Sequence, residues 1–172
     1  MSCITKSAIL TVATLAMAVP AFAEGTFYLS AGKAEKGDIT KSDAMPMALG
    51  YISQSQPSTI WGIDIGREGT MLDSTWGNDS AVASAMSFNL IYGANITKDD
   101  KSRFDIGALL GVRESFSSCP SSYLGYQCYA DTKPTTEYKV NYGVVVTYAY
   151  QSTVFGLRAT GESVQALVGV KF

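Results

Sequence analysis

The sequence predicts an all-β protein: one eight-stranded antiparallel up-and-down β-barrel of the transmembrane type. Three observations predict this fold. After residue 24, hydrophobic side chains recur at every second position, and no segment keeps a helical i, i+3, i+4 stripe for three turns. Turn-like stretches such as Thr160-Gly161-Glu162 separate the alternating segments. The 172 residues fit a single domain, and 47% of them are apolar, enough for a large buried or lipid-facing surface.

The first residues have the features of an export signal rather than of a folded segment. Lys6 gives a positive start, residues 8–19 are mostly small and aliphatic, and Ala21-Phe22-Ala23 matches a cleavage site. The apolar run is well short of the roughly 20 residues that a membrane-spanning helix needs. We therefore expect residues 1–23 to be a cleaved signal peptide and residues 24–172 to form the barrel.

The first four expected strands are 25–33, 45–53, 59–68 and 84–94, and each carries apolar side chains at alternate positions. In chain order these side chains are Phe27, Leu29 and Ala31; Leu49 and Tyr51; Trp61, Ile63 and Ile65; and Phe88, Leu90 and Tyr92.

The last four expected strands are 103–114, 137–150, 153–160 and 163–172. Their alternating apolar residues are Phe104, Ile106, Ala108, Leu110 and Val112; Val140, Tyr142, Val144, Val146 and Tyr148; Phe155 and Leu157; and Val164, Ala166, Val168, Val170 and Phe172. Mainly short connections favour an up-and-down order over a Greek key.

Two orientations of these faces are compatible with alternation alone. A soluble lipocalin-like barrel places the apolar face inside, whereas a membrane barrel places it against lipid. The opposite face is rich in glycine and small polar residues, which suits the narrow interior of eight strands. If the chain starts in the periplasm, the longer connections lie outside and every strand has an aromatic residue near its periplasmic end. These aromatic residues are Phe27, Tyr51, Trp61, Tyr92, Phe104, Tyr148, Tyr150, Phe155 and Phe172.

Charged residues on the small, polar face are expected to point into the barrel. They are Asp64, Glu68, Asp105, Arg113, Lys139 and Arg158. Because burying them unpaired is costly, we expect an ion-paired network that plugs the interior, with Glu68 bound to Arg113, Lys139 or Arg158. An ion path through a narrow pore is the alternative.

The outer connections are the expected recognition surface. Cys119 and Cys128 lie close together in one connection, and an oxidising compartment would join them in a disulfide. Trp76, Tyr123, Tyr126 and Tyr129 are candidate contact residues for a protein or a glycan; the alternative is that they cover the barrel mouth. Arg67 falls on the same alternate positions as the apolar residues of its strand, near the outer rim. There we expect its guanidinium either to bind a lipopolysaccharide phosphate or to extend into water.

Composition excludes several classes of function. The chain has no histidine, so it lacks a Ser-His-Asp or Cys-His nucleophile and a histidine-ligated metal site. The formal net charge of -2 gives no basic excess for nucleic acid. We expect no catalytic residue, no cofactor and no metal.

The C-terminal segment, with apolar residues at alternate positions and a final aromatic, resembles the terminal strand of bacterial outer-membrane barrels. The resemblance implies that the barrel-assembly machinery recognises this strand through Val164, Ala166, Val168, Val170 and Phe172. Segments 26–32, 61–66 and 141–144 also resemble strands of these barrels. The likeness is closest to the small OmpA-like and OmpX-like surface-protein barrels, also called opacity-type porins.

This resemblance implies a location in the outer membrane of a Gram-negative bacterium, in contact with its lipid and lipopolysaccharide. It also implies a non-enzymatic structural or surface role, of the adhesion or resistance type, with a host or surface protein or glycan as partner. Barrel enzymes that remodel lipid A and outer-membrane proteases rely on histidine, so their activities are excluded here. A narrow pore for ions or small solutes and a soluble lipocalin-like binding barrel are the alternatives.

Overall fold

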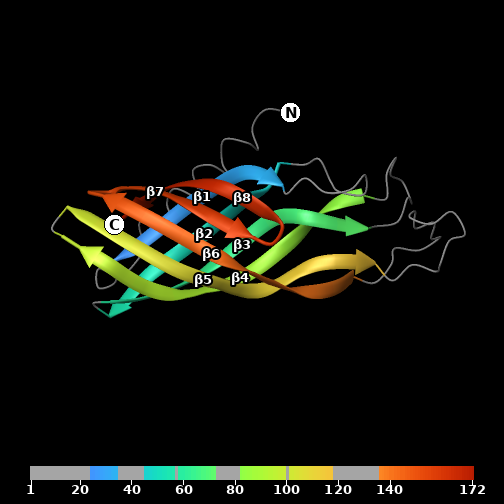
Figure 1. The fold of residues 1–172 in the computed structure, drawn as a ribbon, viewed down its shortest axis with the longest axis horizontal. Coiled ribbons are helices and arrows are strands. Elements are labelled where there is room, and N and C mark those ends of the chain that lie inside the picture. The colour runs from blue at the N-terminus through green and yellow to red at the C-terminus, as the bar shows by residue number, and fades with distance from the viewer. Residues whose placement is uncertain (1–23, 35–44, 57, 73–81, 100, 118–135) are drawn as a thin grey trace, which may run out of the picture.

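The computed structural model describes residues 24–34, 45–56, 58–72, 82–99, 101–117 and 136–172. They form eight strands (Figure 1), at the eight places expected from the alternation. The strands are β1 (Gly25–Ala34), β2 (Met47–Gln56), β3 (Thr59–Leu72), β4 (Val82–Lys98), β5 (Ser102–Ser117), β6 (Thr136–Tyr150), β7 (Thr153–Thr160) and β8 (Ser163–Lys171). No helix among these residues is long and apolar enough to cross a bilayer.

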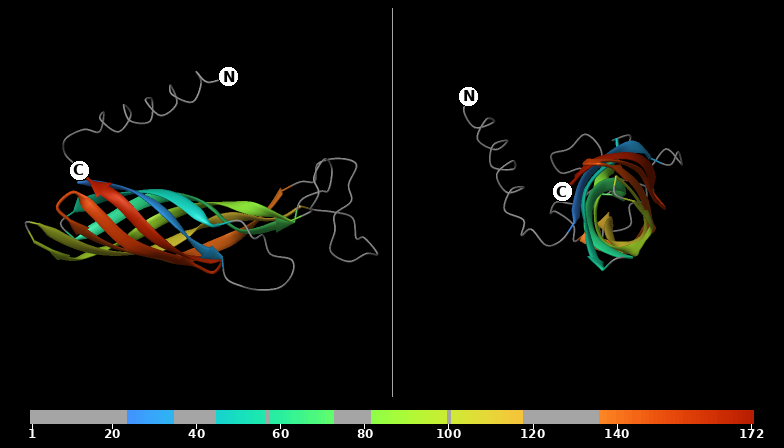
Figure 2. Two further views of the ribbon diagram at one scale, coloured as in Figure 1. Left: turned by 90° about the horizontal axis from the view of Figure 1, so that it is seen from above. Right: turned by 90° about the vertical axis from the view of Figure 1, so that its left-hand side faces the viewer.

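The strands close into a barrel in which each is antiparallel to its sequence neighbours and β1 pairs with β8. The view along the barrel in Figure 2 shows the closed ring. The predicted fold, an eight-stranded up-and-down antiparallel barrel, is therefore confirmed. The end of the barrel at which β2 ends and β3 begins, together with β4–β5 and β6–β7, is called the turn end; the opposite end, at which β1, β3, β5 and β7 end, is called the loop end.

Strand register fixes the relative height of residues around the wall. Following cross-strand partners from Gly25 through all eight strands leads back to β1 at Lys33, eight residues nearer the loop end. Around the barrel from β1 to β8, each successive cross-strand partner therefore lies one residue nearer the loop end. This offset means that the strands are tilted relative to the barrel axis.

One half of the wall is taller than the other. At the loop end β6 pairs with β7 only as far as Gly143 and Thr160, so Thr136–Tyr142 extend beyond β7. β3 extends past its last β2 partner at Arg67, and its Leu72 pairs with Phe116 of β5. The strands β3, β4 and β5 are longer than expected because pairing continues past the apolar stretch into residues without clear alternation.

The apolar face points outward all around the barrel. Leu29, Leu49, Leu90, Leu110 and Val168 are each more than half exposed. The lipocalin-like orientation, with these residues lining the interior, is therefore wrong. An exterior of this kind is costly in water but favourable against lipid.

The interior also contains a cluster of buried apolar residues. Its members are Tyr28, Ile52, Ile60, Ile91, Leu109, Val145, Ala149, Val154 and Leu167. These side chains occupy the interior beside the inward-facing glycines. An eight-stranded barrel is just wide enough for side chains to fill it.

The outward aromatic residues expected near the periplasmic strand ends gather at the turn end. Register places Phe27 opposite Tyr51, Trp61 opposite Tyr92, and Tyr148 between Phe104 and Phe155. The Phe27 ring lies 4.9 Å from that of Tyr51 and 5.6 Å from that of Phe172, measured between centroids. This is the aromatic ring expected from the sequence, at the height where a membrane interface favours such side chains.

Candidate functional site

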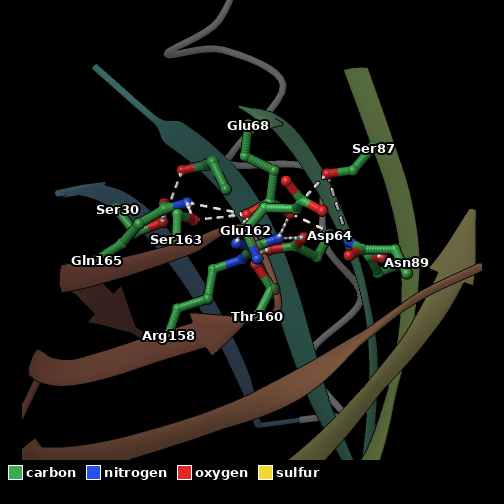
Figure 3. Close-up of polar contacts among 12 residues, drawn as sticks. Ser30, Asp64, Glu68, Ser87, Asn89, Arg158, Thr160, Glu162, Ser163 and Gln165 are labelled. Atoms are coloured by element: carbon green, nitrogen blue, oxygen red, sulfur yellow. Dashed lines mark hydrogen bonds and ion pairs between the residues drawn. The ribbon is translucent and has the colours of Figure 1, made fainter. Parts of the chain in front are cut away.

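Arg158 is the centre of a buried polar network inside the barrel (Figure 3). It lies on β7 and faces Asp64 and Glu68, which are both on β3. Its Nε and Nη2 donate to the two carboxylate oxygens of Asp64 at 3.0 and 2.7 Å. Its Nη1 and Nη2 donate to Glu68 at 2.7 Å each. One guanidinium thus binds two carboxylates in bidentate fashion, the strongest geometry for such pairs.

Neutral donors satisfy the remaining capacity of Glu68. Its Oε2 accepts hydrogen bonds from Thr160, Ser163 and Gln165, and its Oε1 accepts from Ser87 and Asn141. The donors come from β4, β6, β7 and β8, so this carboxylate connects β3 to four other strands of the barrel. Such satisfaction is needed because the network contains two carboxylates for one guanidinium and is excluded from water.

Tyr28 on β1 links the network to the apolar cluster. Its hydroxyl donates to Oδ2 of Asp64 at 2.6 Å, while its ring packs among the buried apolar residues. The ring lies over Gly50 of β2, where a Cβ would overlap it. Because Gly50 has no side chain, the Tyr28 ring can lie over it inside the narrow barrel.

A second network lies at the turn end. Arg103 Nε donates to Asp105 at 2.8 Å, Nη1 contacts Glu24 at 3.3 Å, and Nη2 donates to Thr26 at 3.0 Å. Lys98 also binds Glu24, at 3.0 Å. Arg103 is not among the charged residues that the sequence analysis expects inside the barrel. It lies two positions before Asp105 on the same strand, so the alternation predicts that it faces inward as well.

The neighbouring cations lower the pKa of Glu24. Partial burial raises its pKa, but the hydrogen bond and charge of Lys98, with the charges of Lys171 and Arg103, outweigh this, so the pKa lies below its ordinary value. The residue precedes β1 and anchors the start of the strand to the β4–β5 hairpin.

Part of the apolar cluster lies between the two networks along the strands. On β5, Leu109 lies between Asp105 and Arg113; on β6, Val145 lies between Asn141 and Thr147. The cluster also extends to the turn end, where Ala149 is the cross-strand partner of Arg103.

The remaining charges expected inside occupy other places. Arg113 is paired with Glu162 of the β7–β8 turn, above the Arg158 network, rather than with Glu68. Lys139 is exposed, because it lies on the part of β6 that extends beyond β7 and has no lumen to face. Lys139 was therefore wrongly expected in the network; parity gives the face of a residue but not its height.

Side chains of this arrangement fill the barrel interior. Asp64 and Glu68 are bound by Arg158 and several neutral donors, and Asp105 is bound by Arg103. Within the described ranges, no group of three or more Cys, Asp or Glu residues is placed to hold a metal ion.

Several sequence predictions fall outside the described residues. These are the signal peptide, the Cys119–Cys128 disulfide, and the loop candidates Trp76, Tyr123, Tyr126 and Tyr129. The residues expected to act in assembly all point outward from β8, beside β1. They are Val164, Ala166, Val168, Val170 and Phe172.

An apolar exterior around a polar, side-chain-filled interior defines the class: a small eight-stranded barrel built like those of membranes. Among solved structures, the chain is similar to the Yersinia pestis outer membrane protein Ail, whose backbone structure was determined in a phospholipid bilayer nanodisc. The two are 9% identical, and the match covers 87% of this chain and 99% of Ail with a TM-score of 0.51. At this identity the likeness shows the fold alone. No protein-family model and no curated protein matches the sequence.

Proposed function

We propose that this chain is an integral outer-membrane protein of a Gram-negative bacterium, with a non-enzymatic structural or surface-interaction role. The signal peptide 1–23 exports it, and the barrel-assembly machinery inserts it. The loop end faces outward, and its connections contact a host or surface protein or glycan.

The observation that carries the proposal is the exposed apolar belt around a filled barrel. Leu90, Leu110 and Tyr142 are each more than 60% exposed, and the interior is closed by charge pairs and the apolar cluster. A surface of this kind favours lipid outside, and the closed interior favours a role for the connections rather than for transport.

Fractionation tests the membrane assignment. Cells producing the full chain are lysed, and the membranes are washed with alkaline carbonate, which strips peripheral proteins. We expect the protein to stay in the outer-membrane pellet. Recovery in the soluble periplasmic fraction contradicts the proposal.

Loop replacement tests the surface role. Ser117 and Thr136 are cross-strand partners, so residues 118–135 can be replaced by Asn-Gly, which favours a tight hairpin turn. The matched control replaces 151–152, between the partners Tyr150 and Thr153 at the turn end, by the same dipeptide. We expect binding to immobilised proteins or glycans to be lost with 118–135 and kept with the control. Unchanged binding by the 118–135 variant contradicts a role for this connection.

Planar bilayer recordings distinguish a plug from a narrow pore. We expect no steady conductance from the intact protein. A steady, ion-selective conductance that changes in Arg113→Ala contradicts the plug.

A further inference from the structure

Two cations lie on the outer wall at the same height. Ala31 of β1, Met47 of β2 and Arg67 of β3 form one row of cross-strand partners. Because each row climbs one residue per strand, Arg67 lies two residues higher than Ala31, level with Lys33. The two side chains are separated by β2 alone, about 12 Å around the wall at a strand spacing of ~4.8 Å and a tilt of about 35°.

Both cations are exposed, on the same face as the apolar belt. The chain has four arginines, and three of them have carboxylate partners: Arg103, Arg113 and Arg158. Within the part of the chain that the structure describes, Arg67 and Lys33 have no such partner. Among the described residues, no carboxylate competes with an external group for these two charges.

The surface around them is apolar below and polar above. Met45 and Met47 lie between the cations and are 59% and 49% exposed, and Leu49 and Ile65 continue the belt toward the turn end. No other outward-facing cation of the described strands lies at this upper margin. The margin is where a bilayer changes from acyl chains to headgroups.

We infer that Lys33 and Arg67 form a two-point site for the phosphates of a lipid headgroup in the outer leaflet. Arg67 offers a planar fork that matches phosphate, and Lys33 offers a compact point charge. The acyl chains of the same lipid cover the methionines and the belt below. A soluble anion lacks this second contact, so the surface fits a phosphorylated lipid better than free phosphate. This inference rests on the proposed membrane insertion.

The experiment compares lipid binding by folded variants of the full chain. Lys33→Gln, Arg67→Gln and the double variant are purified in detergent, and bound lipid is counted by native mass spectrometry. The probes are bis-phosphorylated lipid A, its dephosphorylated form, and lipid A with excess inorganic phosphate. Lys101→Gln is the matched control, because it removes one exposed lysine at the opposite, turn end.

We expect each single substitution to weaken lipid A binding about five-fold and the double substitution about twenty-fold or more, as ~1 kcal/mol per cation implies. Lys101→Gln and inorganic phosphate should have no effect, and dephosphorylated lipid should bind the intact protein and the double variant equally. Wild-type affinity in the double variant overturns the inference. So does an equal loss in Lys101→Gln, or displacement of the lipid by inorganic phosphate.

A parallel folding assay in vesicles separates this inference from the proposed function. If the intact protein fails to insert, the membrane assignment fails. If all variants insert and bind lipid A alike, only the lipid site fails.

Discussion

At the scale of single residues, Arg158 is the side chain on which most of the interior depends. It is fully buried and forms ion pairs with two buried carboxylates. Arg158→Met leaves Asp64 and Glu68 without a cation, so the free energy of unfolding should fall by about 3–5 kcal/mol. Urea titration in lipid vesicles measures this.

The triple variant Asp64→Asn, Glu68→Gln, Arg158→Met removes all three charges together and should lose less stability than Arg158→Met alone. Arg67→Gln, on the outer wall, should change the free energy of unfolding by less than about 0.5 kcal/mol. An unchanged urea midpoint for Arg158→Met contradicts the central role of this guanidinium.

Two glycines provide a matched pair at the same scale. A Cβ at Gly50 would overlap the ring of Tyr28, whereas a Cβ at Gly161 meets nothing within 4 Å. Gly50→Ala should therefore cost about 1–3 kcal/mol by overpacking and displace the Tyr28 hydroxyl from Asp64, while Gly161→Ala should be nearly neutral. Equal urea midpoints for the two variants would mean that Tyr28 does not cross the interior at Gly50.

At the scale of elements, the start of β1 is held to the β4–β5 hairpin through Glu24. Its pKa is lowered in the folded protein, so its contribution to stability is present above the ordinary value of 4.5 and is lost as pH falls through the lower folded value. The difference in unfolding free energy between wild type and Glu24→Gln should be constant near neutral pH and shrink below pH 4.5. Urea midpoints measured from pH 6 to pH 3 test this, and a difference that stays constant over that range contradicts the assigned contacts.

The strands were predictable because their alternation is strong. On β6, Tyr142, Val144 and Tyr148 alternate with Asn141, Gly143 and Thr147, and a one-residue slip would reverse both faces. Strand ends were less predictable. The last residues of β3 and the first of β4 carry no such alternation, since they lie beyond the belt.

The site was predictable in part. Asp64, Glu68 and Arg158 share one parity, and parity indicates a common face. It does not indicate height around a tilted barrel, which is why Lys139 was expected inside and Glu162, from a short turn, was not. The pairing of Arg113 with Glu162 depends on register between strands far apart in the sequence, and periodicity within one strand carries no information about it.

At the scale of the whole molecule, the wall is uneven: β3 to β6 rise above β7, β8, β1 and β2 at the loop end. The belt ends at the level of Lys33 and Arg67, and the taller half continues past it. Positions with similar exposure in the structure should therefore differ in surroundings, with lipid around some and water around others.

Leu90 and Tyr138 test this difference, and with it the claim that the belt lies in a membrane. Leu90 is 66% exposed and pairs with Ile63, about halfway in height between Trp61 and Arg67; Tyr138 is 57% exposed on the extension of β6. The decisive measurement is the free energy of unfolding of Leu90→Arg and Tyr138→Arg in lipid vesicles. The account predicts a loss of about 2–4 kcal/mol for Leu90→Arg and about 0–1 kcal/mol for Tyr138→Arg. Equal, small losses at both positions would contradict it.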